Sequence, residues 1–388
     1  MPDTRTHVSD WDVIVAGAGP AGSTAALAAR RANPAARVLL LDAAVFPRDK
    51  ACGDGIAPHA LDVLAELGVP PAQLTAATTA IQTLRLRSPA GIQAARAFAR
   101  PAWVVPRRWF DHRLVQHAQA AGATLRQHRV RHLAITNDSV LVDGQYRTRV
   151  LIGADGAESV IRRAVAATPP PPASVALAIR GYLPADRLPA AEQLLVMSAA
   201  RWPAYAWAFP IGNGLANIGY GELPRTGQRP NRSQLLTQLA ALLPDQPVST
   251  ATDLRAHRLP LSPGRPAFAH GPVLLAGDAA CLINPLTGEG IYYAIRSGQL
   301  AGAAATTPDP ARTYRHTMRR HLGRHLRHTD LLARANQRPG LIETVVAASR
   351  ANQHAFDGLV ELGLAAGTLN PSLVGYLLTG MIRARRPH

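Results

Sequence analysis

The chain of 388 residues has two cysteines, one lysine and few aromatic residues. Cys52 and Cys281 are far apart in sequence, so they indicate neither a disulfide framework nor a metal-ligand pattern. We therefore expect a reduced, intracellular protein without a metal site. Aromatic residues make up only 5% of the chain and no nucleic-acid-binding motif occurs, which argues against a nucleic-acid partner.

Long apolar runs are also missing. No run reaches the roughly 18 apolar residues that suggest a membrane-spanning helix. The first ten residues are polar, without the apolar core of a signal peptide. We expect a cytoplasmic location.

The charge is strongly positive, because 42 Lys+Arg face 25 Asp+Glu for a net charge of +17. Lys50 is the only lysine, so arginine carries almost all of this charge. Between Arg312 and Arg327, arginines alternate with apolar residues at near-helical spacing and predict an amphipathic basic helix. We favour a helix that packs its apolar stripe against the protein. The alternative is a helix that contacts a membrane peripherally or meets a pyrophosphate-bearing substrate.

A glycine-rich loop near the N-terminus predicts a dinucleotide site. An apolar run at 12–16 indicates a buried strand, and an alanine-rich helix follows the loop. The first glycine would supply a tight turn, the second a close approach of backbone to a pyrophosphate, and the third close packing of helix on strand. The loop consists of Gly17, Ala18, Gly19, Pro20, Ala21 and Gly22.

An acid at the end of the next strand supports this interpretation. The run 37–41 indicates a second buried strand, and Asp42 lies about 20 residues past the glycines, where a carboxylate accepts ribose hydroxyls. The pattern predicts a dinucleotide cofactor but does not separate FAD from a nicotinamide.

Further motifs between residues 10 and 305 resemble the geranylgeranyl reductase branch of a flavoprotein group that also contains aromatic hydroxylases and flavin-dependent halogenases. The resemblance implies FAD as the cofactor, with NADPH or NADH as the reductant. It is carried by the glycine loop, the segment Phe46-Pro47-Arg48-Asp49-Lys50-Ala51-Cys52-Gly53-Asp54-Gly55-Ile56, Arg107 with Phe110-Asp111, Gly153-Ala154-Asp155-Gly156, Tyr205-Ala206-Trp207-Ala208-Phe209-Pro210, and residues 277–291.

The resemblance implies cofactor contacts for several of these residues. It places Arg48, Cys52 and Gly53 beside the isoalloxazine ring. Cys52 is then either a weak candidate for the catalytic proton donor or a small side chain that fills space. Arg107 would contact the cofactor, with a helix-start ion pair to Asp111 as the alternative.

Two further acids belong to the implied FAD site. Asp155 belongs to a motif that the family associates with FAD and NADPH, and we expect its part in that motif to be structural. Gly277 and Asp278 follow a predicted strand at 273–276, and the Asp278 carboxylate would bind a ribityl hydroxyl. A helix N-cap is the alternative role for Asp278.

The segment that follows lacks bulky side chains. Pro285, Gly288 and Gly290 precede a helix predicted to start near Ile291, so a flat ring could lie against backbone N–H groups. Such a helix start would stabilise negative charge on a reduced flavin. For Glu289 we favour an acid that complements the helix dipole over a catalytic role.

Three aromatic residues alternate along one predicted strand. Tyr205, Trp207 and Phe209 therefore share a face, which is either a wall for an apolar substrate or sheet core. Tyr205 is also a weak candidate for the proton donor. Geranylgeranyl reductases carry a proline three residues before this tyrosine, whereas this chain has Trp202 there and Pro203 next to it.

The predicted fold is α/β, with a Rossmann-like FAD-binding domain, an inserted antiparallel β-sheet substrate domain and a C-terminal helical region. The FAD-binding domain is discontinuous and the proline run at 169–172 marks a crossing. The expected ranges are 10–80, 107–170 and 263–310 for the FAD-binding domain, 81–106 and 171–262 for the substrate domain, and 311–388 for the helical region.

The sequence is consistent with three functions. The favoured one is an FAD-dependent oxidoreductase that uses NAD(P)H to reduce C=C bonds of an apolar, isoprenoid-like or prenylated substrate. The second is an FAD-dependent monooxygenase that hydroxylates a natural product through a flavin hydroperoxide. A halogenase variant of this function is disfavoured, because it needs a lysine beyond the flavin and Lys50, in the cofactor loop, is the only lysine. The third is a non-enzymatic escort of prenylated proteins, against which the intact 285–290 segment and the Cys52 loop argue.

Overall fold

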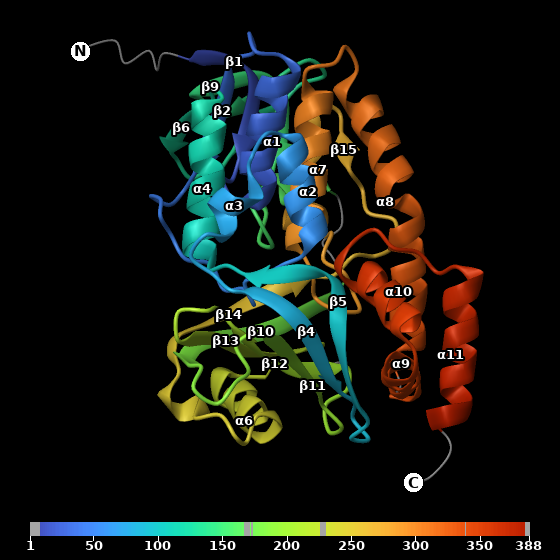
Figure 1. The fold of residues 1–388 in the computed structure, drawn as a ribbon. Helices are drawn as coiled ribbons and strands as arrows, with labels where there is room; N and C mark the ends of the chain where they lie inside the picture. The colour runs from blue at the N-terminus through green and yellow to red at the C-terminus, as the bar shows by residue number, and fades with distance from the viewer. Residues whose placement is uncertain (1–7, 167–170, 172–173, 226–229, 338, 385–388) are drawn as a thin grey trace.

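Two β-sheets, one above the other, form the body of the protein (Figure 1). The computed structural model describes residues 8–166, 171, 174–225, 230–337 and 339–384. Most of the proline run at 169–172 lies outside these residues. The predicted α/β class and its three parts are confirmed, with the helices of the C-terminal region beside the second sheet.

The first sheet, sheet A, has a parallel core in the order β16-β9-β1-β2-β6. Its inner strands are apolar and buried, as β2 shows with four fully buried residues in five, which is typical of a parallel sheet covered by helices. Its strands are β1 (Ser9–Ala16), β2 (Val38–Asp42), β6 (Thr124–Gln127), β7 (Leu133–Ile135), β8 (Val140–Val142), β9 (Tyr146–Gly153), β15 (Ala269–His270) and β16 (Val273–Leu275).

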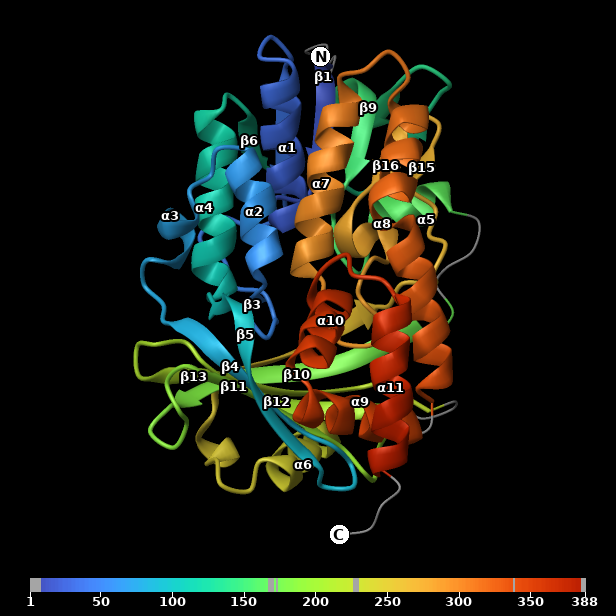
Figure 2. The ribbon, with the colours of Figure 1, turned by 45° about the vertical axis from the view of Figure 1, so that its right-hand side comes forward.

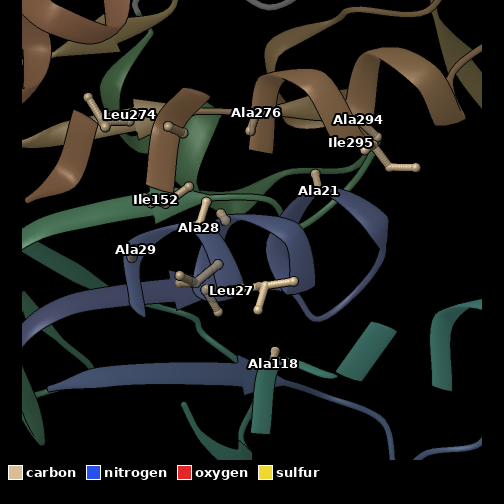
Figure 3. Close-up of a cluster of buried hydrophobic side chains, with 14 of the residues drawn as sticks. Ala21, Leu27, Ala28, Ala29, Ala118, Ile152, Leu274, Ala276, Ala294 and Ile295 are labelled. Atoms are coloured by element: carbon tan, nitrogen blue, oxygen red, sulfur yellow. The ribbon is translucent and has the colours of Figure 1, made fainter. Parts of the chain in front are cut away.

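Helices α1 and α7 pack side by side against sheet A (Figure 2). Their contact consists of small residues, and Figure 3 shows Ala21 of α1 close to Ala294 of α7. Side chains this small let the two backbones approach closely. The helices of this half are α1 (Pro20–Ala32), α2 (Pro58–Glu66), α3 (Pro71–Thr75), α4 (Arg107–Ala120), α5 (Val160–Val165) and α7 (Ile291–Ala305), with the 3₁₀ turn η3 (Gly277–Ala280).

The second sheet, sheet B, lies below sheet A in Figure 1 and is mostly antiparallel. The prediction of an antiparallel sheet needs one correction, because β11 pairs with β4 in parallel. This pair joins strands from both segments assigned to the substrate domain, and β3 joins the sheet from within the range 10–80. The strands, in sheet order, are β14 (Thr252–Pro260), β10 (Val175–Pro184), β13 (Leu215–Glu222), β12 (Ala204–Pro210), β11 (Glu192–Met197), β4 (Ala80–Arg87), β5 (Gln93–Val104) and β3 (Gly55–Ile56).

The C-terminal helices cover one end of sheet B, where α9 and α10 pack against β5 (Figure 2). The remaining helices are α6 (Arg232–Leu242), α8 (Pro310–Ala335), α9 (Gly340–Ala351), α10 (Gln353–Leu364) and α11 (Pro371–Ala384), with the 3₁₀ turn η2 (Val248–Thr250). No helix in the described ranges has the length and hydropathy needed to cross a membrane.

Helix α8 is the predicted amphipathic basic helix. Its apolar stripe packs into the core, because Tyr314, Met318 and Leu322 are fully buried, and the Tyr314 hydroxyl donates to the Leu275 carbonyl at 2.8 Å. The packed alternative is therefore confirmed. The buried stripe of Tyr314, Met318 and Leu322 is not available to a bilayer, whereas the arginine face of α8 stays available for contact with a membrane or a phosphate.

Candidate functional site: a cofactor cradle continuous with an apolar cavity

One cavity of about 1070 Å³ runs from the glycine loop of sheet A to the space between sheet B and the C-terminal helices. Its volume lies just above the usual range for ligand pockets, about 300–1,000 Å³. Eighteen predicted site residues line it: Gly17, Gly19, Pro20, Ala21, Asp42, Arg48, Cys52, Gly53, Arg107, Asp155, Tyr205, Trp207, Phe209, Asp278, Pro285, Gly288, Gly290 and Ile291. Two others, Gly22 and Gly277, lie behind the wall.

The glycine loop has the geometry of a dinucleotide cradle. Gly17 has a φ of +100°, and a Cβ there would lie 2.2 Å from the Ala154 carbonyl oxygen. A Cβ on Gly22 would lie 1.7 Å from the Gly17 oxygen, so neither position accepts a side chain. Gly19 differs, because a Cβ there would meet only the ends of arginine side chains, at 3.5 Å for Arg48 and 3.9 Å for Arg107. Gly19 therefore faces the open cavity.

The start of α1 is suited to an anion. Gly19 is its N-cap and supplies no side-chain hydrogen bond, so N–H groups of the first turn are available to a ligand. Asp42 braces the loop from the end of β2, since its Oδ2 accepts from the Ala18 N–H at 2.7 Å. Uncapped N–H groups next to two guanidinium groups fit the pyrophosphate of FAD.

A buried ion cluster holds those two arginines. Arg107 donates to both carboxylate oxygens of Asp111, at 2.6 and 2.8 Å, and Arg48 donates to the same carboxylate at 2.8 Å. Asp111 is fully buried and Arg107 is 4% exposed. The helix-start ion pair is therefore present. Arg107 also lines the cavity, and its contact with the cofactor stays a prediction.

Asp278 lies opposite the glycine loop in the turn η3. The N-cap of this turn is Ala276, so the N-cap role for Asp278 is wrong. Its Oδ2 instead accepts from the Lys50 ammonium at 3.1 Å. Burial raises the pKa of the Asp278 carboxyl, but the charge and hydrogen bond of Lys50, together with the nearby His257 and Arg107, outweigh burial and the net shift is downward. A charged carboxylate is thus present on the cavity wall.

Asp155 supports the start of α5 at the cavity edge, where Ser159 is the N-cap. One carboxylate oxygen accepts from the Ser159 hydroxyl and the other from the Val160 and Ile161 N–H groups. These bonds satisfy the first turn of α5. The structural role predicted for Asp155 is therefore to hold the start of α5 in place.

The segment before α7 forms a flat wall. Gly288 has a φ of +74°, and a Cβ there would lie 3.0 Å from the Tyr205 hydroxyl oxygen. That hydroxyl donates to the Thr287 carbonyl, which ties the aromatic strand of sheet B to this wall. Glu289 accepts from the Tyr292 N–H at 2.8 Å. It precedes α7, whose first turn contains no acid, so its role in complementing the helix dipole stays a prediction.

The aromatic face of β12 meets the Cys52 loop. Tyr205, Trp207 and Phe209 share one face and line the cavity. A Cβ on Gly53 would lie 3.5 Å from Trp207 and 3.6 Å from Phe209. Burial raises the pKa of the Cys52 thiol, so the thiol keeps its proton at neutral pH. The prediction of a wall for an apolar substrate agrees with this position.

Two polar side chains hold the Cys52 loop: Asp54, which belongs to the loop motif, and Asn217, for which the sequence predicted no role. The Asn217 amide donates to the Cys52 carbonyl and to Asp54, and accepts from the Trp207 indole N–H, each at 2.8 Å. Asp54 is fully buried and also accepts from the Tyr182 hydroxyl. Burial raises the pKa of Asp54 to about 6. The loop is therefore fixed by side chains from three strands of sheet B and by its own aspartate.

Glu289 makes the stability of the protein depend on pH. Burial raises its pKa from 4.5 to about 7, so its contribution is complete below pH 4.5 and is lost as the pH rises through about 7. Glu289→Gln keeps an acceptor for the Tyr292 N–H without a charge. We expect the free energy of unfolding of the variant, relative to the unmodified protein, to be about 2 kcal/mol higher at about pH 8 than at about pH 5 in urea titrations. An equal difference at both pH values would contradict the assignment.

This fold and site define an FAD-dependent oxidoreductase. The model of the FAD binding domain family matches residues 10–180. The chain is 36% identical over 320 residues to the menaquinone reductase of Mycolicibacterium smegmatis, covering 76% of each chain. It is 32% identical over 314 residues to digeranylgeranylglycerophospholipid reductase 1 of Methanopyrus kandleri, covering 76% of this chain and 80% of that one.

A solved structure from Thermoplasma acidophilum, of a geranylgeranyl bacteriochlorophyll reductase-like protein, has the same fold. The TM-score is 0.74 at 20% identity, over 97% of both chains. With these relatives and the motifs above, the chain belongs to the geranylgeranyl reductase family of FAD-dependent oxidoreductases.

Proposed function

We propose that this protein reduces a C=C bond of an isoprenoid substrate, with FAD as the cofactor and NADPH or NADH as the reductant. The observation that carries the proposal is the continuity of the cavity: the cofactor cradle opens directly into an apolar arm. The arm runs between sheet B and the C-terminal helices and includes Leu84, Leu195, Val345, Phe356, Leu359 and Val360. An elongated hydrocarbon is the ligand that such a surface binds best.

The named relatives support the same substrate class. The names menaquinone reductase and digeranylgeranylglycerophospholipid reductase both refer to substrates with isoprenoid chains. We infer that this chain acts on a substrate of the same kind, with its chain in the apolar arm.

The protein's own residues bind and orient the reactants. The first turn of α1 and the arginines beside it would hold the pyrophosphate of the cofactor, and Asp278 would hold its ribityl chain. Bound FAD would supply the two-electron chemistry for the double bond. The aromatic wall and the C-terminal helices exclude water from the substrate.

Two groups are placed to hold the proton that the product needs. Burial raises the pKa of both the Cys52 thiol and the Tyr205 hydroxyl. Both groups therefore stay protonated at neutral pH and face the cavity. Tyr205 already donates to the Thr287 carbonyl, so Cys52 is the freer donor and the better candidate.

The test is anaerobic reduction of the purified yellow protein with NADPH or NADH, followed by mixing with a short-chain prenylated quinone. We expect the flavin colour to return faster than without substrate, and the product to gain two hydrogen atoms by mass spectrometry. A substrate with a fully saturated chain is the control. A product that instead gains oxygen, and only in air, would reject the reductase in favour of a monooxygenase.

A further inference from the structure

Gln193 is a buried polar side chain in an otherwise apolar part of the cavity wall. It lies on β11 and is 6% exposed. Leu195 and Met197 follow it on the same face of the strand and also line the cavity. Within the described ranges, no other group donates to or accepts from its side-chain amide. Because Gln193 lines the cavity, its unpaired amide is available to hydrogen-bond a ligand there.

The amide lies where the substrate arm meets the Cys52 loop. A Cβ on Gly55 would lie 3.7 Å from the Gln193 Nε2 atom, so the amide borders this loop. On its other side, β11 pairs with β12 so that Leu195 is opposite Trp207. Gln193 is two residues from Leu195 and therefore lies at the Phe209 end of the aromatic wall. This is the end of the wall that contacts the loop at Gly53.

We propose that Gln193 determines substrate specificity by donating a hydrogen bond to a neutral oxygen on the substrate, the carbonyl of a prenylated quinone. This proposal rests on the proposed function and adds the headgroup to it. An uncharged amide matches an uncharged carbonyl, whereas phosphate oxygens are bound most strongly by guanidinium groups. In the proposed function, the two arginines of the nearby cradle, Arg48 and Arg107, serve the pyrophosphate of FAD, so they are not left for a phosphate on the substrate.

The hydrogen bond would also orient the reacting chain. The carbonyl and the prenyl group are attached to the same ring in such a quinone. When Gln193 holds the carbonyl beside the Cys52 loop, the first double bonds of the chain lie along the aromatic wall. A ligand without the carbonyl would bind at several positions along the apolar arm, because apolar contacts are not directional.

The experiment compares two ligands on the FAD-loaded protein. One is a short-chain prenylated naphthoquinone and the other is the prenylated naphthalene with the same chain, which lacks both carbonyls. Binding is measured by perturbation of the flavin absorbance, for the unmodified protein and for Gln193→Leu and Gln193→Glu. Gln193→Glu keeps the size of the side chain but removes its N–H donors. Met197→Leu, a volume-conserving change on the same face of β11, is the matched control.

We expect Gln193→Leu to weaken quinone binding about three- to tenfold, as for loss of one hydrogen bond. Binding of the prenylated naphthalene should stay the same or become tighter, and Met197→Leu should change both ligands alike. If Gln193→Leu changed the affinity for both ligands equally, the inference about Gln193 would be overturned and the proposed function would stand. If the unmodified protein bound neither ligand, the proposed function would fail as well.

Discussion

Gly298→Ala, the addition of a single methyl group, should lower the free energy of unfolding by about 3 kcal/mol and leave the protein largely without FAD. Gly298 lies in α7, where a Cβ would be 2.2 Å from the Ala21 carbonyl oxygen of α1. A carbonyl oxygen on a helix backbone cannot rotate away, so one of the helices must shift. Ala21 belongs to the glycine loop, and the shift therefore displaces the cradle itself.

The matched control is Gly323→Ala, the same change in the middle of α8. The nearest atom to a Cβ there is the Arg319 Cβ at 3.7 Å, an ordinary contact. Alanine is the better helix former by about 1 kcal/mol, so this variant should be more stable than the unmodified protein. Both variants are compared by urea unfolding and by flavin content after purification. Equal stability of the two would show that α1 and α7 have room to separate.

The sequence predicted the cradle because its pattern is local. The turn, the helix start and Asp42 fall within about thirty residues. The backbone geometry of the turn and the helix start requires glycine at fixed positions, which makes the pattern visible in the sequence. Alternation in β12 predicted that Tyr205, Trp207 and Phe209 share a face. Period-two patterns are equally local, which is why the predicted strand through these three residues agrees with β12.

Contacts between distant segments could not be predicted in the same way. Gly298 gives no local signal, because a glycine in an alanine-rich helix reads only as a weak helix former. Asn217 and Gln193 are single amides in strands, and their roles depend on the loops that sheet B brings to them. The parallel pairing of β4 with β11 was missed for the same reason, since register between strands far apart in sequence follows from the whole sheet.

Asp111→Asn should be the most damaging change of a single charge, with a loss of about 3–5 kcal/mol in stability. The Asp111 carboxylate is fully buried and is shared by Arg48 and Arg107. Without its charge, Arg107 remains buried and uncompensated. Both guanidinium groups also border the cavity beside Gly19, so we expect weaker FAD binding in addition.

Asp62→Asn provides the control for the loss of an aspartate paired with arginine. Asp62 pairs with Arg100 at 2.7 Å, but both side chains are about half exposed, at 46% and 52%. An exposed pair contributes at most about 1 kcal/mol. The comparison by urea unfolding therefore separates the effect of burial from the effect of pairing. Similar losses for Asp111→Asn and Asp62→Asn would contradict the buried-charge argument.

A double variant separates stability from cofactor binding. Adding Arg107→Gln to Asp111→Asn removes the uncompensated buried charge, so part of the lost stability should return. FAD binding should not return with it, because one of the two cations proposed to bind the pyrophosphate is gone. Flavin titration of the single and double variants measures this difference. Recovery of both properties together would mean that Arg107 acts on FAD only through the fold, and that the uncapped start of α1 and Arg48 are sufficient for the pyrophosphate.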